Sequence, residues 1–138
     1  MADDTPELLA HVLLPLANKE DAVRTASALE PYSPQSVTAL HVVEKAEGVP
    51  DETPVEHSEE IYAAVRTVFP DAAEHTAYSR TVVEAVFEVA EEVDASAIAY
   101  QTRGGGRLTR FLSGDPGLKL VTEADRPVIA LPRLEPEE

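Results

Sequence analysis

Apolar runs and helix-like patterns alternate along almost the whole chain. Short runs rich in Val, Ile, Leu and Ala have the composition and length of buried strands. They predict strands at 11–16, 36–43, 73–79, 96–101 and 126–132. Between them, apolar residues recur at intervals of three and four, which predicts helices at 18–31, 57–69, 81–93 and 115–124. The predicted order is strand and helix in strict alternation, closing on a strand.

Local signals support the helix starts. Asn18 is suited to cap the first helix, Thr81 and Glu84 have the spacing of a capping box, and Asp115 precedes a proline that suits a first helical position. Periodicity then assigns the buried faces. They are Ala22, Val23, Ala26 and Leu29 in the first helix, Ile61, Val65 and Val68 in the second, and Val82, Val86, Ala90 and Val93 in the third.

Strands that alternate with helices predict an α/β domain with one doubly wound, five-stranded parallel sheet and helices on both faces. We expect the strand order 3-2-1-4-5 and a single domain over residues 1–138, in which 133–138 form a frayed tail. In such sheets ligands bind beyond the carboxyl ends of the strands, where the strand order reverses. The loops expected at that point are 17–21 and 102–115.

Charge narrows the classes of partner. The chain has 26 Asp and Glu residues against 11 Lys and Arg residues, a formal net charge of −15. This charge repels nucleic acids and anionic membranes, and it suits a salt-rich cytoplasm that screens self-repulsion. An ordinary acidic protein is the alternative. The chain has no cysteine, no apolar run of membrane-spanning length and no basic leader at its start, so we expect a soluble cytoplasmic protein.

The segment YQTRGGGRLTRFLSGD (residues 100–115) departs from this acidic background. No acid occurs between Ala95 and Gly114, and three glycines stand among arginines. Glycines let backbone N–H groups approach a phosphate, and a following helix start adds positive potential. Four of the 11 cations lie within 17 residues, in this segment and just after it: Arg103, Arg107, Arg110 and Lys119. The segment is typical of an anion-binding loop, although its arginines could instead pair with acidic helices or a partner subunit.

These residues resemble the universal stress protein family over almost the whole chain. HVLLPLANKEDAVRTASAL, VTALHVVE and DRPVIALP are similar to its opening strand and helix, its second strand and its closing strand. Nucleotide-binding members carry G-2x-G-9x-G-[S/T], and nine residues separate Gly104 from Gly114 here. The resemblance implies an adenine nucleotide alpha hydrolase-like fold, with ATP or AMP as ligand.

The motif is incomplete in this chain. Gln101 occupies the position of the first glycine, Asp115 that of the hydroxyl residue, and Ala17 that of an Asp in the family's first loop. Ionised Asp115 cannot donate a hydrogen bond. At a separation of ~4 Å from a phosphate it costs roughly 1 to 4 kcal/mol. Asn18 could partly replace the missing Asp, one residue late.

We therefore expect a regulatory or stress-response domain with a degenerate nucleotide- or anion-binding site. Its residues would be Ala17, Asn18, Gln101, Arg103, Gly104, Gly106, Arg107, Gly114 and Asp115. The alternative is a protein-interaction module that no longer binds nucleotide. No Walker A lysine motif, nucleophile elbow or pair of nucleophile and base occurs, so we expect no enzyme.

Two further expectations concern metals and assembly. Metal-ligand spacing is absent among the histidines, His11, His41, His57 and His75, so we expect no metal site, and we expect His11 and His41 to be packed or edge histidines on strands. The closing strand carries Val128, Ile129 and Leu131, an apolar edge that invites antiparallel pairing with a second copy. The resemblance also implies a homodimer through this strand. A monomer whose edge is protected by Pro127 and Pro132 is the alternative.

Overall fold

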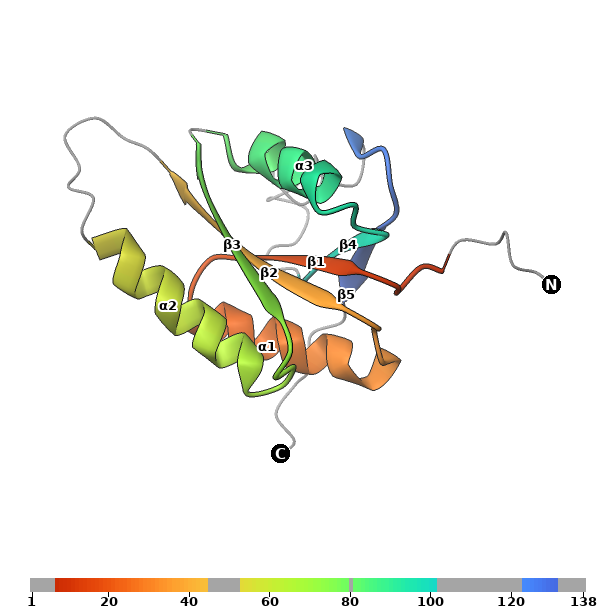
Figure 1. The fold of residues 1–138 in the computed structure, drawn as a ribbon, viewed down its shortest axis with the longest axis horizontal. Coiled ribbons are helices and arrows are strands. Elements are labelled where there is room, and N and C mark those ends of the chain that lie inside the picture. The colour runs from red at the N-terminus through yellow and green to blue at the C-terminus, as the bar shows by residue number, and fades with distance from the viewer. Residues whose placement is uncertain (1–6, 45–52, 80, 102–122, 132–138) are drawn as a thin grey trace, which may run out of the picture.

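The computed structural model describes residues 7–44, 53–79, 81–101 and 123–131 (Figure 1). Its elements are β1 (Val12–Leu16), α1 (Lys19–Leu29), a 3₁₀ turn (Glu30–Tyr32), β2 (Val37–Glu44), α2 (Thr53–Arg66), β3 (Ala73–Ser79), α3 (Val82–Glu92), β4 (Ala97–Gln101) and β5 (Val128–Leu131). The strands form one parallel sheet in the order β3-β2-β1-β4-β5. The predicted fold class and strand order are confirmed.

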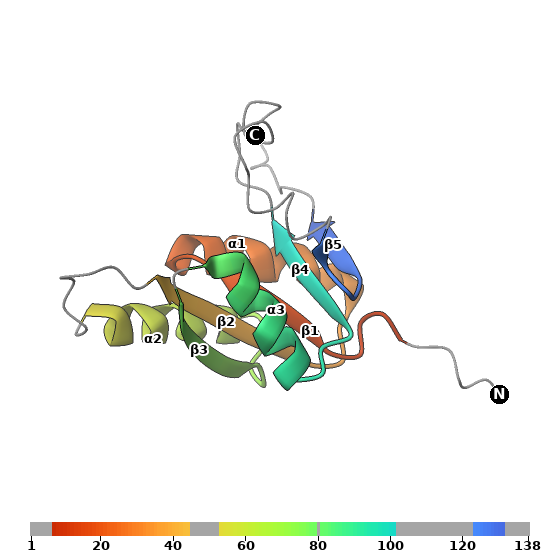
Figure 2. The same ribbon diagram turned by 90° about the horizontal axis from the view of Figure 1, so that it is seen from above.

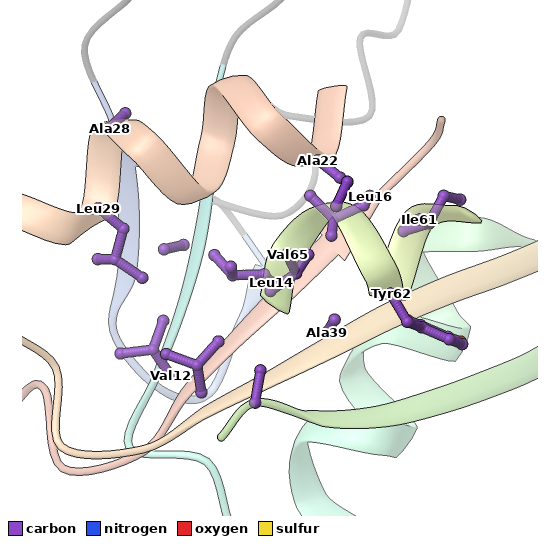
Figure 3. Close-up of a cluster of buried hydrophobic side chains, with 14 of the residues drawn as sticks. Val12, Leu14, Leu16, Ala22, Ala28, Leu29, Ala39, Ile61, Tyr62 and Val65 are labelled. Carbon is purple, nitrogen blue, oxygen red and sulfur yellow. The ribbon is translucent and has the colours of Figure 1, made fainter. Parts of the chain in front are cut away.

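The helices cover both faces of the sheet. Helices α1 and α2 lie on one face and α3 lies on the other (Figures 1 and 2). Because strand side chains alternate, β1 sends Val12, Leu14 and Leu16 into the cluster beneath α1 and α2, and Leu13 into the cluster beneath α3. Figure 3 shows the first cluster, in which Ile61 and Val65 of α2 pack toward β1. None of the described helices combines the length and apolar composition that a membrane span requires.

Strand β1 is the central strand of the sheet. Val12, Leu13 and Leu14 are each 0% exposed. At its amino end the backbone N–H of Ser96 donates to the His11 carbonyl oxygen (2.7 Å), and the N–H of His11 donates to Ser96 Oγ (2.9 Å). This exchange fixes the register in which Val12 pairs with Ala97.

Three local predictions were wrong. Val23 is 41% exposed, because the helical phase that buries Ala22 and Ala26 turns the intervening position outward. Helix α2 begins before residue 57 and ends at Arg66, so Val68 lies beyond it. The Thr81 side chain makes no capping bond, and its N–H donates to Ser79 Oγ (3.0 Å).

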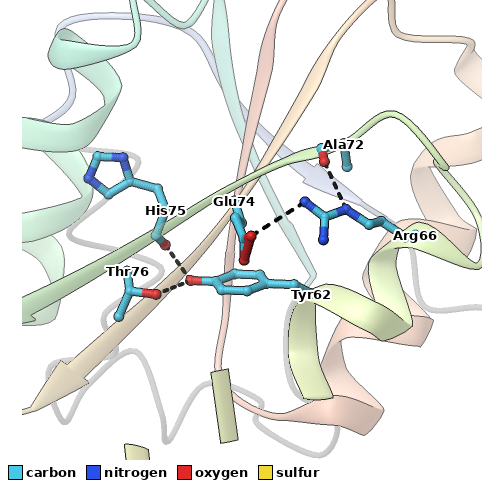
Figure 4. A network of polar contacts seen from close by, with 6 residues as sticks. All are labelled: Tyr62, Arg66, Ala72, Glu74, His75 and Thr76. Atoms are coloured by element: carbon cyan, nitrogen blue, oxygen red, sulfur yellow. Dashed lines mark hydrogen bonds and ion pairs between the residues drawn. The ribbon is translucent and has the colours of Figure 1, made fainter. Parts of the chain in front are cut away.

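A polar network ties α2 to the edge strand β3 (Figure 4). The Tyr62 hydroxyl donates to the His75 carbonyl oxygen (2.6 Å) and also contacts Thr76 Oγ1. One turn further along α2, Arg66 Nε donates to the Ala72 carbonyl oxygen (3.1 Å), and its guanidinium lies 3.7 Å from the Glu74 carboxylate. Burial raises the pKa of Tyr62, so its hydroxyl stays protonated and remains a donor.

Replacing Tyr62 by Phe should lower the free energy of unfolding by about 1 kcal/mol, because it leaves the His75 carbonyl without its side-chain donor. Chemical denaturation in concentrated KCl measures the change. Tyr32→Phe is the matched control, since Tyr32 is 53% exposed. Equal effects of the two substitutions would contradict the structural role given to the Tyr62 hydroxyl.

Candidate functional site

The candidate site lies at the carboxyl ends of β1 and β4, where the strand order reverses. The ladder between these strands pairs Val12 with Ala97 and Leu13 with Ile98. Toward the carboxyl ends β1 stays paired with β2 as far as Leu16, and β4 with β5 as far as Gln101. At this edge of the sheet, β1 therefore pairs with β2 on one side of the switch point, and β4 pairs with β5 on the other. Ala17, Asn18 and Gln101 lie at these strand ends.

Six predicted site residues belong to the segment that follows β4. They are Arg103, Gly104, Gly106, Arg107, Gly114 and Asp115, and they lie outside the described residues. Ala17, Asn18 and Gln101 are described, and the fold brings their strand ends to the same edge of the sheet.

A closed turn connects β1 to α1. Asn18 is the N-cap of α1, and its Oδ1 accepts from the Asp21 N–H (2.8 Å). The Asp21 carboxylate accepts from the Ala17 N–H at Oδ2 (2.9 Å) and from the Thr25 hydroxyl at Oδ1 (3.2 Å). The reciprocal bonds resemble a capping box that reaches one residue further upstream. Asp21 therefore places a negative charge on this turn, although Ala17 itself has none.

Asp21 is a site residue that was not predicted from the sequence. The signal was present, because an acid three residues after an N-cap asparagine has the spacing of a capping-box partner. Its contact with the Ala17 N–H could not be read from the spacing, since it depends on how sharply the chain leaves β1.

Two histidines meet beside this turn. His57 Nε2, from α2, lies 3.3 Å from the Ala17 carbonyl oxygen. His41 Nδ1, from β2, lies 2.6 Å from Ser58 Oγ, and the two imidazole centroids are 5.1 Å apart at an interplanar angle of 71°. Burial, followed by the proximity of His57, lowers the pKa of His41. The sequence predicted a packed or edge histidine at His41 but did not indicate its pairing with His57.

Gln101 ends β4 and is 9% exposed. Its neighbours at alternate positions, Ala97 and Ala99, are fully buried, and Ala99 belongs to the cluster beneath α1 and α2. Alternation therefore directs Gln101 toward the same face, at the register position of Leu131.

The described residues contain no group of three or more His, Cys, Asp or Glu side chains arranged to hold a metal ion. In this part of the chain the site offers backbone groups, one carboxylate and an imidazole pair. That set suits hydrogen bonding and charge recognition.

No protein-family model matches the chain, and no curated protein sequence matches it either. Solved structures do. Hypothetical protein MJ0577 superposes with a TM-score of 0.75 at 15% identity, over 94% of this chain and 100% of that one. A universal stress protein in complex with cAMP gives a TM-score of 0.69 at 14% identity, over 91% and 98% of the two chains.

A third match is the universal stress protein from Archaeoglobus fulgidus in complex with dAMP. It gives a TM-score of 0.65 at 20% identity, over 91% of this chain and 99% of that one. The chain has the fold of the universal stress proteins. The expectation drawn from the sequence motifs is confirmed at the level of fold, and the coverage extends over nearly all of each matched chain.

Replacing Asp21 by Ala should lower the free energy of unfolding by about 1 kcal/mol, because it leaves the Ala17 N–H without its acceptor and removes a favourable charge from the α1 start. Asp21→Asn retains an acceptor oxygen and should cost less. Denaturation curves measure both values. Glu20→Ala provides the control, since Glu20 is an exposed acid in the same helical turn. The role of Asp21 is contradicted if both alanine variants lose the same stability.

Proposed function

We propose that this chain is a regulatory or stress-response domain of universal stress protein type, acting without catalysis in a salt-rich cytoplasm. Its site is the carboxyl edge between β1 and β4, and its ligand is an anion, with an adenine nucleotide as the first candidate. One observation carries the proposal: the strand order reverses at Ala17 and Gln101. Other proteins of this fold were solved with cAMP or dAMP.

The residue pattern supports weak binding. Gly104 and Gly114 keep the motif spacing, and Arg103 and Arg107 supply positive charge. Asp115 replaces a hydroxyl donor with a carboxylate, which costs roughly 1 to 4 kcal/mol beside a phosphate. We therefore expect an affinity well below that of a chain with the complete motif.

A second candidate function is a protein-interaction module that has lost its nucleotide. A specific observation favours it: the β1–α1 turn uses its polar groups internally. The Ala17 N–H bonds Asp21, the Ala17 carbonyl lies near His57, and the Asn18 side-chain oxygen caps α1. A ligand that needed these groups would have to displace bonds that already exist.

We also propose a homodimer through β5. Among the described strands β5 ends the sheet order, so no described strand pairs with its outer backbone edge, which is where a second copy would pair. Val128 and Ile129 are half-buried, and Leu131 is 3% exposed within the core. Leu131 therefore anchors the strand, and the pairing would depend on backbone bonds and its neighbours. Light scattering in concentrated KCl should give twice the chain mass, and a monomer mass would contradict the dimer.

Calorimetric titration of ATP and AMP, with and without Mg²⁺ in multimolar KCl, tests the ligand. The wild type should bind weakly. The triple variant Ala17→Asp, Gln101→Gly and Asp115→Ser should bind at least about tenfold more tightly, since it restores the motif and removes the like charge. The triple variant keeps the net charge, and Asp71→Ser, which removes an exposed acid in the turn before β3, controls for the loss of an acid outside the site. If neither the wild type nor the triple variant gives binding heat, nucleotide binding is contradicted. The protein-interaction module would then be the better proposal.

A further inference from the structure

We propose that His41, His57 and Ser58 form a proton-sensitive latch that holds α2 against the β1–α1 turn. In the neutral state the latch is closed. Proton uptake favours an open state in which α2 withdraws from the carboxyl edge of the sheet. The latch itself is independent of any ligand, whereas its use to regulate the candidate site rests on the proposed function.

The geometry places the latch at a junction of three elements. Consecutive α2 residues reach two different strands: His57 lies against the Ala17 carbonyl just after β1, and Ser58 bonds His41 within β2. His41 is itself the register partner of Leu16, the last residue of β1. A small displacement of α2 would therefore disrupt both contacts together.

Among the side chains that the structure describes, few charges face the pair, and the charge that shifts the pKa of His41 is that of His57. On the β1–α1 turn, the Asp21 carboxylate is engaged by the Ala17 N–H and the Thr25 hydroxyl. On β3, the register partner of His41 is the neutral Thr76, and Glu74 pairs with Arg66.

On α2, Glu59 and Glu60 follow the latch in sequence and are exposed, and the neutral Tyr62 hydroxyl bonds β3. Within the described residues, the histidine that forms an ion pair with a carboxylate is His75, with Glu92 at 3.6 Å. A second proton on the pair therefore meets repulsion across 5.1 Å between ring centroids.

Proton linkage gives the direction of the switch. Burial and the neighbouring His57 lower the pKa of His41 from its ordinary value of 6.5, so the closed state favours neutral His41. An open state that solvates the imidazole binds the proton more tightly. The latch is fully closed above pH 6.5 and weakens as the pH falls below it toward the lowered pKa. One linked proton changes the opening equilibrium by at most about tenfold per pH unit.

Amide hydrogen exchange of the full chain between pH 5 and 7.5, corrected for intrinsic exchange rates, tests the latch. Protection of residues 57–66 should fall by up to about tenfold per pH unit below pH 6.5, relative to α3. His41→Asn keeps a polar atom near Ser58 but cannot titrate, so it should abolish this pH dependence. His75→Gln, on the other face of the sheet, should preserve it.

Two results would overturn the latch. One is that, in the wild type, the hydrogen-exchange protection of α2 changes with pH in the same way as that of α3. The other is an NMR titration midpoint of the wild-type His41 ring at or above 6.5, a measurement that stands even if His41→Asn does not fold. His57→Gln should raise this midpoint, because it removes the neighbouring charge.

A parallel AMP titration at pH 7.5 and 5.5 separates regulation from the proposed function. The change in AMP affinity between the two pH values should be larger for the wild type than for His41→Asn. The ionisation of AMP itself affects both proteins equally, so it cancels in this comparison. Equal changes in the two proteins would overturn the regulatory role. Absence of AMP binding at both pH values would overturn the proposed function. The hydrogen-exchange experiment would still test whether the latch exists, because it uses no ligand.

Discussion

The fold depends on the burial of β1 between the two helix layers. Val12, Leu13 and Leu14 have no exposed surface, and the strand has a neighbour on each edge. Such a strand must be apolar on both faces, because its side chains alternate between the α1–α2 cluster and the α3 cluster. Polar residues can therefore begin only where β1 ends. This constraint places the first available polar groups, at Ala17 and Asn18, on the carboxyl edge where the strand order reverses.

The hydrogen bonds that stabilise the β1–α1 turn also limit what the carboxyl edge can bind. The chain leaves β1 and enters α1 within two residues, and the Asn18 and Asp21 bonds stabilise that change of direction by roughly 1 kcal/mol each. His57 adds a contact from α2 to the Ala17 carbonyl. These bonds preorganise the turn, but its polar groups are then already hydrogen-bonded within the protein. A site built this way favours ligands that it recognises by charge and shape over ligands that must replace its internal bonds.

The sequence predicted the strands and their order because apolar periodicity and strict strand–helix alternation report burial directly. The predictions were wrong where the rotation of a helix about its axis, or the contacts of a single side chain, determines the structure. Val23 matched the helical spacing but is exposed, and Thr81 stands at the N-cap of α3 without a side-chain capping bond. The pairing of His41 with His57 depends on strand parity and on the rotation of α2, neither of which follows from their separation in sequence. Gly104, Arg107 and Asp115 remain sequence-based assignments, because they lie outside the described residues.

The central claim is that the carboxyl edge between β1 and β4 is the ligand site. Residue-resolved NMR during an AMP titration in concentrated KCl tests it most directly. We expect the largest amide shifts at Ala17, Asn18 and Gln101, with little change at the opposite ends of these strands, at Val12 and Ala97. Shifts confined to other surfaces, or a spectrum unchanged by millimolar-scale nucleotide, would contradict it.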